Sequence, residues 1–184
     1  MDGSQEHAHG CLRTTLWRLP ELTVPVAEIT ATHVALSENV AVDTRELERN
    51  AERILQGSTP PGLDNIERLA HAGELLPDWY DDWIVGEREH LSQLRLVALE
   101  AAADRLVQAA RYPEATVAAL AAVRTDPLRE SAQRVLIRSY LGGGNVAGAL
   151  RQFTLFRTEL GRSVGVEPSA QMLDLVRGIA SARV

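Results

Sequence analysis

The sequence predicts a mainly α-helical protein of stacked helical hairpins, preceded by one further helix and a β-hairpin. From Asp43 onward, apolar residues recur every three or four positions, which is the period of an amphipathic helix. Turns that contain glycine or proline separate these stretches. The stretch from Leu22 to Val42 is instead rich in Val, Ile and Thr, which favour strands. We therefore expect two domains, residues 1–42 and 43–184.

The composition excludes several classes of protein. The chain has 184 residues, and no apolar run approaches the ~18 residues that a membrane span needs. A single cysteine, Cys11, allows no internal disulfide, and the polar residues 1–10 do not resemble a signal peptide. We therefore expect a cytoplasmic protein without membrane contact. A net charge of −6 opposes a general affinity for nucleic acid, because phosphate binding relies on a positive field.

Residues 1–42 predict one helix and then a hairpin. The helix extends from Gly10 to Leu19, with three leucines on one face, and ends at Pro20. Two short strands, within 24–30 and 33–36, flank a tight Thr-Ala-Thr turn.

The second domain begins with a helix that Asp43 caps. Glu46 completes a capping-box pattern, and Val42 with Leu47 fits a hydrophobic staple. The Gly- and Pro-rich stretch 57–62 ends this helix, and a shorter helix follows before Gly73. The expected inward residues of this pair are Leu47, Ala51, Ile54, Leu55, Leu63, Ile66, Leu69 and Ala70.

Five further helices are expected from Glu87 onward. The first spans 87–111 and is closed by Tyr112-Pro113, because a residue before proline avoids helical angles. The second spans about 114–124, and Asp126 as a cap with Pro127 at the first position opens the third. The turn at 142–145 precedes the fourth, and Glu167-Pro168-Ser169 precedes the last. The expected inward residues are Leu91, Leu94, Ala98, Ala101, Ala102, Leu106, Ala132, Val135, Leu136, Ser139, Tyr140, Ala149, Phe153, Phe156, Leu160, Met172, Leu175, Val176 and Ile179.

A repeat of 34 residues connects these helices. A shift of this length pairs Leu94 with Leu128 and Ala98 with Ala132, and it brings the turns into coincidence. The core positions Ala115, Ala119 and Ala122 then align with Ala149, Phe153 and Phe156. This is the tetratricopeptide period, in which a helical hairpin buries its apolar face only by stacking on the next one. A generic helical bundle with hairpins of similar length is the alternative.

An aromatic segment separates the first helical pair from the repeats. Residues 73–83 contain Trp79, Tyr80 and Trp83, and rings of this size bury large surfaces. We expect these rings to form a wedge between helices.

This segment resembles the bacterial transcriptional activator domain of the SARP (Streptomyces antibiotic regulatory protein) family. The matching residues are Leu76, Pro77, Asp81, Asp82, Trp83, Glu87, Arg88 and Leu91. Asp126 to Glu130 resembles the family's junction between repeats, and 160–169 resembles its closing motif. Arg162 and Ser163 are inserted in that motif, so a longer loop is expected there. The resemblance extends from Val42 to about Val184.

The resemblance implies a transcriptional activator that is not an enzyme and uses no cofactor. In the family, this domain follows an OmpR-type winged helix-turn-helix, so residues 12–19 would be the recognition helix and Leu22 to Leu36 the wing. The preceding strands and two helices of a winged helix are absent from the sequence. A completed winged helix would bind promoter DNA. The helical domain would contact the transcription machinery, another protein or a second copy of the chain.

The candidate DNA-binding residues are Arg13, Thr14 and Arg18, because arginine bonds guanine or phosphate and threonine bonds phosphate or a base edge. Arg13 and Arg18 lie about 140° apart around a helix, so one of them would contact phosphate or an internal acid. Residues 1–42 contain two arginines and five acidic residues, a balance that opposes DNA binding. A stand-alone interaction module without DNA binding is therefore the alternative function.

The candidate partner-binding residues lie on helix faces expected to be exposed, beside a concave groove where a peptide or helix could dock. They are Arg105, Arg134, Arg138 and Arg151.

Two chemical alternatives, a metal site and acid–base catalysis, are disfavoured. His7, His9 and Cys11 lack a fourth metal ligand. The carboxylates between Asp81 and Glu89 lack an accompanying nucleophile or histidine, so they favour a solvated rim with an ion pair to Arg88 rather than acid–base catalysis.

Overall fold

The computed structural model describes residues 2–18, 26–30 and 33–181, apart from the side chains of 2–6, 16–18, 29 and 179–181. Over these residues the chain is mainly helical, with eight helices and one two-stranded sheet, as predicted. It divides into two compact units, Met1–Asp43 and Thr44–Val184, and each is described by itself.

The first unit contains a helix and a hairpin. Its elements are α1 (Asp2–Arg18), β1 (Ala27–Ile29) and β2 (Val34–Leu36). The predicted start of α1 at Gly10 is wrong, because the helix already begins at Asp2. The residues before Gly10 contain no proline and include the good helix formers Gln5, Glu6 and Ala8.

The hairpin is antiparallel and pairs Ala27 with Leu36. Its turn is closed by Thr30, whose N–H donates to the carbonyl of His33 at 2.9 Å, while the N–H of His33 donates to the Thr30 hydroxyl at 3.0 Å. The predicted hairpin is thus confirmed within the described residues, and the expected strand residue Val24 lies outside them.

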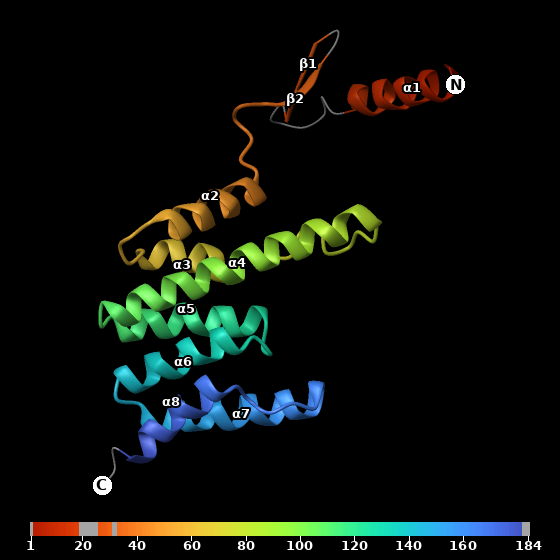
Figure 1. The fold of residues 1–184 in the computed structure, drawn as a ribbon. Coiled ribbons are helices and arrows are strands. Elements are labelled where there is room, and N and C mark those ends of the chain that lie inside the picture. The colour runs from red at the N-terminus through yellow and green to blue at the C-terminus, as the bar shows by residue number, and fades with distance from the viewer. Residues whose placement is uncertain (1, 19–25, 31–32, 182–184) are drawn as a thin grey trace. The chain divides into compact units, whose positions relative to one another are not determined.

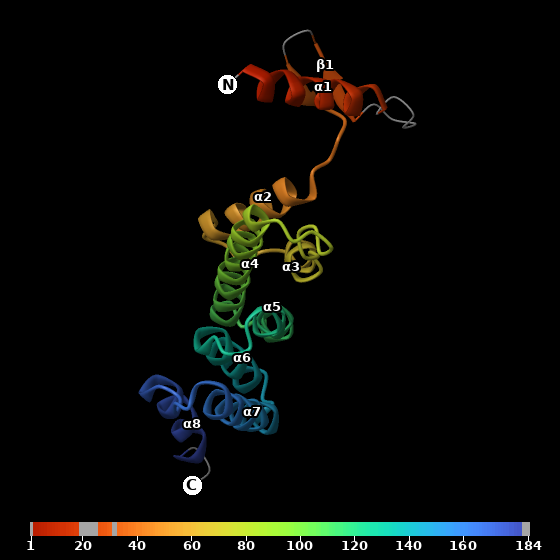
Figure 2. The same ribbon diagram turned by 90° about the vertical axis from the view of Figure 1, so that its right-hand side faces the viewer.

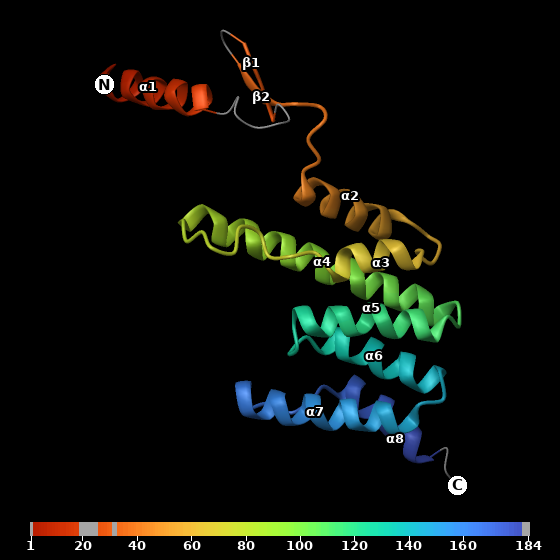
Figure 3. The same ribbon diagram turned by 180° about the vertical axis from the view of Figure 1, so that it is seen from behind.

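The second unit is a stack of helices in chain order (Figures 1 and 3). Its helices are α2 (Asp43–Gln56), α3 (Leu63–Ala70), α4 (Asp82–Gln108), α5 (Tyr112–Thr125), α6 (Glu130–Gly142), α7 (Val146–Val164) and α8 (Ala170–Ser181). Sequential helices from α3 to α8 contact one another, and α3 also contacts α5 while α4 contacts α6. Figure 2, a view along several helix axes, shows the layers. Contacts between equivalent helices of successive hairpins define a tetratricopeptide-like stack.

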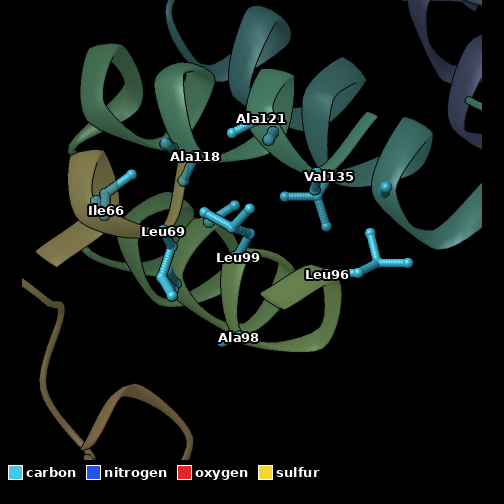
Figure 4. Close-up of a cluster of buried hydrophobic side chains, with 14 of the residues drawn as sticks. Ile66, Leu69, Leu96, Ala98, Leu99, Ala118, Ala121 and Val135 are labelled. Atoms are coloured by element: carbon cyan, nitrogen blue, oxygen red, sulfur yellow. The ribbon is translucent and has the colours of Figure 1, made fainter. Parts of the chain in front are cut away.

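The larger of two buried clusters contains residues from each helix between α2 and α6, inclusive. Figure 4 shows Ile66 and Leu69 of α3 facing Leu99 of α4, with Ala118 of α5 and Val135 of α6 close by. The buried residues of α5 are all small: Ala115, Ala118, Ala119, Ala121 and Ala122. Because these side chains are small, the backbone of α5 can approach its neighbours closely.

The smaller cluster joins α6, α7 and α8. Its buried members are Ile137, Ala149, Phe156, Leu160 and Met172.

Across both clusters, most of the predicted inward residues are buried or half-buried, and Ile179 lies outside the described side chains.

Two predicted inward leucines are exposed. Leu55 in α2 and Leu63 at the start of α3 are each 39% accessible to solvent. These helices form the first layer of the stack, and within the unit no preceding hairpin covers them. Helical periodicity identifies the apolar face but does not show how much of it another element covers.

The connection between α4 and α5 differs from the prediction. The helix α4 ends at Gln108, and Ala110 adopts a left-handed conformation with φ of 56° that turns the chain. Tyr112 and Pro113 therefore open α5 instead of closing α4. Proline is well tolerated there because the first turn of a helix has no internal partner for its missing N–H.

The start of α6 also differs. Asp126 does not cap this helix; its carboxylate accepts a hydrogen bond from the N–H of Leu128 at 3.0 Å and stabilises the preceding turn. The helix begins at Glu130 rather than at Pro127.

Arg162 and Ser163, which the resemblance suggests to be an insertion, lie in a helix and not in a loop. The last turn of α7 includes both residues, and each bonds Glu159, the arginine at 2.9 Å and the serine hydroxyl at 2.9 Å. The helix ends at Val164 and is followed by Gly165, whose left-handed φ of 74° suits glycine. Nothing in the inserted pair breaks a helix, so the expected longer loop does not form.

Candidate interaction surfaces

The candidate DNA-binding residues lie in the second half of α1. Arg13 and Thr14 are both exposed, and the Thr14 hydroxyl donates to the carbonyl of Gly10 at 3.0 Å. This bond uses the only donor of the side chain, which leaves oxygen lone pairs as acceptors. Arg18 is the last residue of α1, and its side chain lies outside the described part of the structure.

Arg105 is half-buried and binds the end of another helix. Its guanidinium donates to the carbonyls of Ile54 and Gly57 at the carboxyl end of α2, and its Nε donates to the carbonyl of Ala101 at 3.2 Å. Terminal helix carbonyls lack partners within their helix and carry partial negative charge. Arg105 satisfies two of them, so the expectation that it is exposed is wrong.

Arg138 and Arg134 are also half-buried and bonded within the stack. Arg138 forms an ion pair with Asp104 of α4, which lies one repeat of 34 residues earlier. Arg134 bonds Glu130 at 2.7 Å. The stacking of equivalent helices brings Asp104 and Arg138 together, and helical periodicity alone could not show this.

Arg151 differs from the other three arginines. It is exposed on α7 and forms no ion pair with any residue that the structure describes. Of the four candidate partner-binding arginines, it alone presents an unpaired charge to solvent.

Glu130 connects α6 to the start of α8. Its carboxylate accepts the N–H of Ser169 at 2.8 Å and also the Ser169 hydroxyl, in addition to the bond from Arg134. Burial alone would raise the pKa of Glu130. The hydrogen bonds from Ser169 and the bond and charge of Arg134 outweigh burial and lower the pKa.

We expect Glu130→Gln to destabilise the helical unit by about 1–2 kcal/mol at pH 7, because it removes a charged hydrogen-bond acceptor. The pKa is lower in the folded state than in the unfolded state, so this contribution is present above about pH 4.5 and disappears as the pH falls through the folded pKa. Urea denaturation of both proteins between pH 7 and pH 3 tests this. The difference should shrink toward pH 3, whereas a constant difference would contradict the assignment. Glu52→Gln, at an exposed position of α2, is the control.

Arg88 holds the segment before α4 against that helix. Its Nε donates to the carbonyl of Leu75 at 2.7 Å, and its Nη2 donates to the carbonyls of Leu76 and Trp79. It also forms an ion pair with Glu74 at 3.3 Å. The expected ion pair of Arg88 with a carboxylate between Asp81 and Glu89 is not formed among the described residues, because Arg88 pairs with Glu74 of the preceding segment. The bonds to three carbonyls have no signal in the sequence beyond the presence of the arginine.

We expect Arg88→Ala to release this segment and to destabilise the unit by about 1–3 kcal/mol, since three carbonyls lose a charged donor. Chymotrypsin should then cleave faster after Trp79 and Tyr80. Limited proteolysis with mass spectrometry measures the rate, and Arg68→Ala at an exposed position of α3 is the control. Equal cleavage of the Arg88→Ala variant and the wild type would show that other contacts hold the segment.

The aromatic residues do not form the expected wedge. Trp79 is 53% exposed, Tyr80 86% and Trp83 59%. The amino-terminal part of α4, which includes Trp83, extends beyond the neighbouring helices (Figures 1 and 3). Ile84, which is fully buried, occupies the inward position of this turn instead.

The described residues contain no group of three or more His, Cys, Asp or Glu side chains that could hold a metal ion. Cys11 lies 3.7 Å from His7, its neighbour one turn earlier in α1. Within the same residues, no helix has both the length and the apolar character needed to cross a membrane.

Stacked helical hairpins with charged and aromatic outer surfaces define a helical-repeat domain. The family model described as the bacterial transcriptional activator domain matches residues 67–180, from within α3 to the end of the stack. This match covers more than half of the chain, so the chain belongs to that family, a family of transcription regulators. A search of curated proteins found no match.

Proposed function

We propose that the chain is a transcription regulator of the SARP type. The family match at residues 67–180 carries this proposal. It is supported by the unit Met1–Asp43, where a helix is followed by an antiparallel hairpin, the order expected of a recognition helix and its wing. In this proposal α1 meets promoter DNA through Arg13, Thr14 and Arg18.

The helical unit serves for protein contacts in this proposal, either with the transcription machinery or with a second copy of the chain. Its exposed Arg151 is a candidate contact. Arg105 and Arg138 act mainly by holding helices of different layers together, and Arg134 bonds Glu130 within α6, so the bonds of all three are intramolecular. The protein works in the cytoplasm, needs no cofactor and is not an enzyme.

The experiment for DNA binding starts from random-sequence duplexes. The protein should enrich a preferred sequence, and a gel-shift titration with that duplex should show at least about tenfold weaker binding for Arg13→Ala, as expected for the loss of a bidentate base contact. Arg68→Ala, on the other unit, should bind like the wild type. Failure to enrich any sequence would reject DNA binding by this chain.

A stand-alone interaction module without DNA binding is the second candidate function. The excess of five acidic residues over two arginines in 1–42 favours it, because a negative field repels phosphate. Under this proposal the enrichment fails, while sedimentation or pull-down experiments still detect assembly through the helical unit.

A further inference from the structure

An exposed aromatic and acidic surface lies at the start of α4. We define the aromatic–acidic surface by the exposed residues Asp78, Trp79, Tyr80, Asp81, Asp82, Trp83 and Glu87. All three of its rings are more than half exposed. Scattered apolar residues on a surface are normal, but a cluster of large rings with a polar rim marks an interaction site.

The carboxylates of this surface are not neutralised by any cation among the described side chains. Residues 74–89 contain six acidic residues and one arginine, Arg88. That arginine is already bonded to three backbone carbonyls and to Glu74. None of the four acids of the surface forms an ion pair with a described residue, whereas Glu100, Asp104 and Glu130 within the stack are all paired. The unbalanced negative charge therefore calls for a positively charged occupant.

The surface is held in place before any partner binds. Arg88 fixes the backbone from Leu75 to Trp79, and the N–H of Trp79 donates to the carbonyl of Leu76 at 3.0 Å. On the other side, the buried Ile84 anchors the first turn of α4. A preformed surface loses little conformational entropy when a partner docks.

We propose that the aromatic–acidic surface binds an arginine-rich segment of a partner protein. A guanidinium can stack on an indole face and form hydrogen bonds to a carboxylate with the same planar group. An arginine can therefore bind both the rings and the carboxylates of this surface. An apolar partner would bury carboxylates without hydrogen bonds, which is costly. A second copy docked through the same surface would place like charges together. This inference rests on the proposed function, since it specifies the partner of the helical unit.

The test uses the full chain and a fluorescently labelled peptide of eight arginines, followed by anisotropy at 0.15 M salt. Octa-lysine should bind more weakly and octa-glutamate should not bind. Trp79→Ala and Trp83→Ala should each weaken octa-arginine binding by about five- to tenfold, as expected for a lost cation–π contact. Asp81→Asn combined with Asp82→Asn should weaken it further and reduce its dependence on salt.

Matched controls separate this surface from the rest of the domain. Leu155→Ala changes an apolar residue that is 65% exposed on α7, and Glu52→Gln removes an exposed charge on α2. Both should bind octa-arginine like the wild type, and circular dichroism should show that every variant is folded.

The proposal is overturned if Trp83→Ala binds octa-arginine like the wild type, or if octa-lysine binds equally well, because either result indicates general attraction to an acidic protein. It is also overturned if the tryptophan variants dissociate a self-associated form in sedimentation without affecting peptide binding, since the occupant is then a second copy. The assay contains no DNA, so its failure is distinct from failure of sequence enrichment through α1.

Discussion

Phe156→Ala is expected to lower the free energy of unfolding of the helical unit by about 3–5 kcal/mol. Phe156 is 1% exposed and packs in the cluster that joins α6, α7 and α8. Its removal deletes a large apolar contact and leaves a cavity beside Ile137 and Met172. Urea denaturation followed by circular dichroism at 222 nm, a wavelength sensitive to helix content, measures the loss.

The neighbouring residue provides the control. Leu155 lies on the same helix but is 65% exposed, so Leu155→Ala should change the free energy of unfolding by less than about 0.5 kcal/mol. Similar small losses for both variants would contradict the packing of α7 against α6 and α8.

Ala119→Leu is expected to destabilise the unit by about 1–3 kcal/mol through overpacking. Ala119 is completely buried on α5, whose buried residues are all alanines. A leucine side chain there requires α5 to move away from the adjacent helices, which disturbs the largest core cluster. The same denaturation experiment measures the effect.

Ala147→Leu is the matched control, because it makes the same change at an exposed position of α7. It should leave the free energy of unfolding nearly unchanged. A neutral result for Ala119→Leu would mean that the α5 interface contains space that the structure does not show.

These stability changes separate folding from recognition. Trp83 is 59% exposed, so its replacement with alanine should cost much less stability than Phe156→Ala. It should still weaken binding of the proposed arginine-rich partner. A binding defect that appears without a stability defect is therefore expected only at the aromatic–acidic surface.

Elements bounded by strong local signals were predicted well. The helix α2 begins at Asp43, where the capping pattern lies, and ends before the Gly- and Pro-rich stretch. The bounds of α5 and α6 were less accurate. The left-handed Ala110 turns the chain before Pro113, so this proline lies within α5. The turn at Asp126 includes Pro127, so this proline lies before α6.

The candidate residues show which contacts cannot be predicted from neighbouring positions in the sequence. The helical period correctly placed Arg134 and Arg138 away from the apolar face, and it also places Glu130 next to Arg134 on α6. It could not show that Asp104 would meet Arg138. The acid that pairs with Arg138 comes from the preceding layer, so only the stacking of the repeats reveals it.

The sequence by itself determined the helical class, the 34-residue repeat and the family resemblance, because periodicity and turn residues act over a few neighbouring positions. The tertiary structure alone decided which groups meet and which remain in solvent. Trp79 and Trp83 have the character of core residues but are more than half exposed, just before and within the part of α4 that extends past its neighbours (Figure 1). Burial depends on the presence of an opposing surface, and the residue's own chemistry does not provide one.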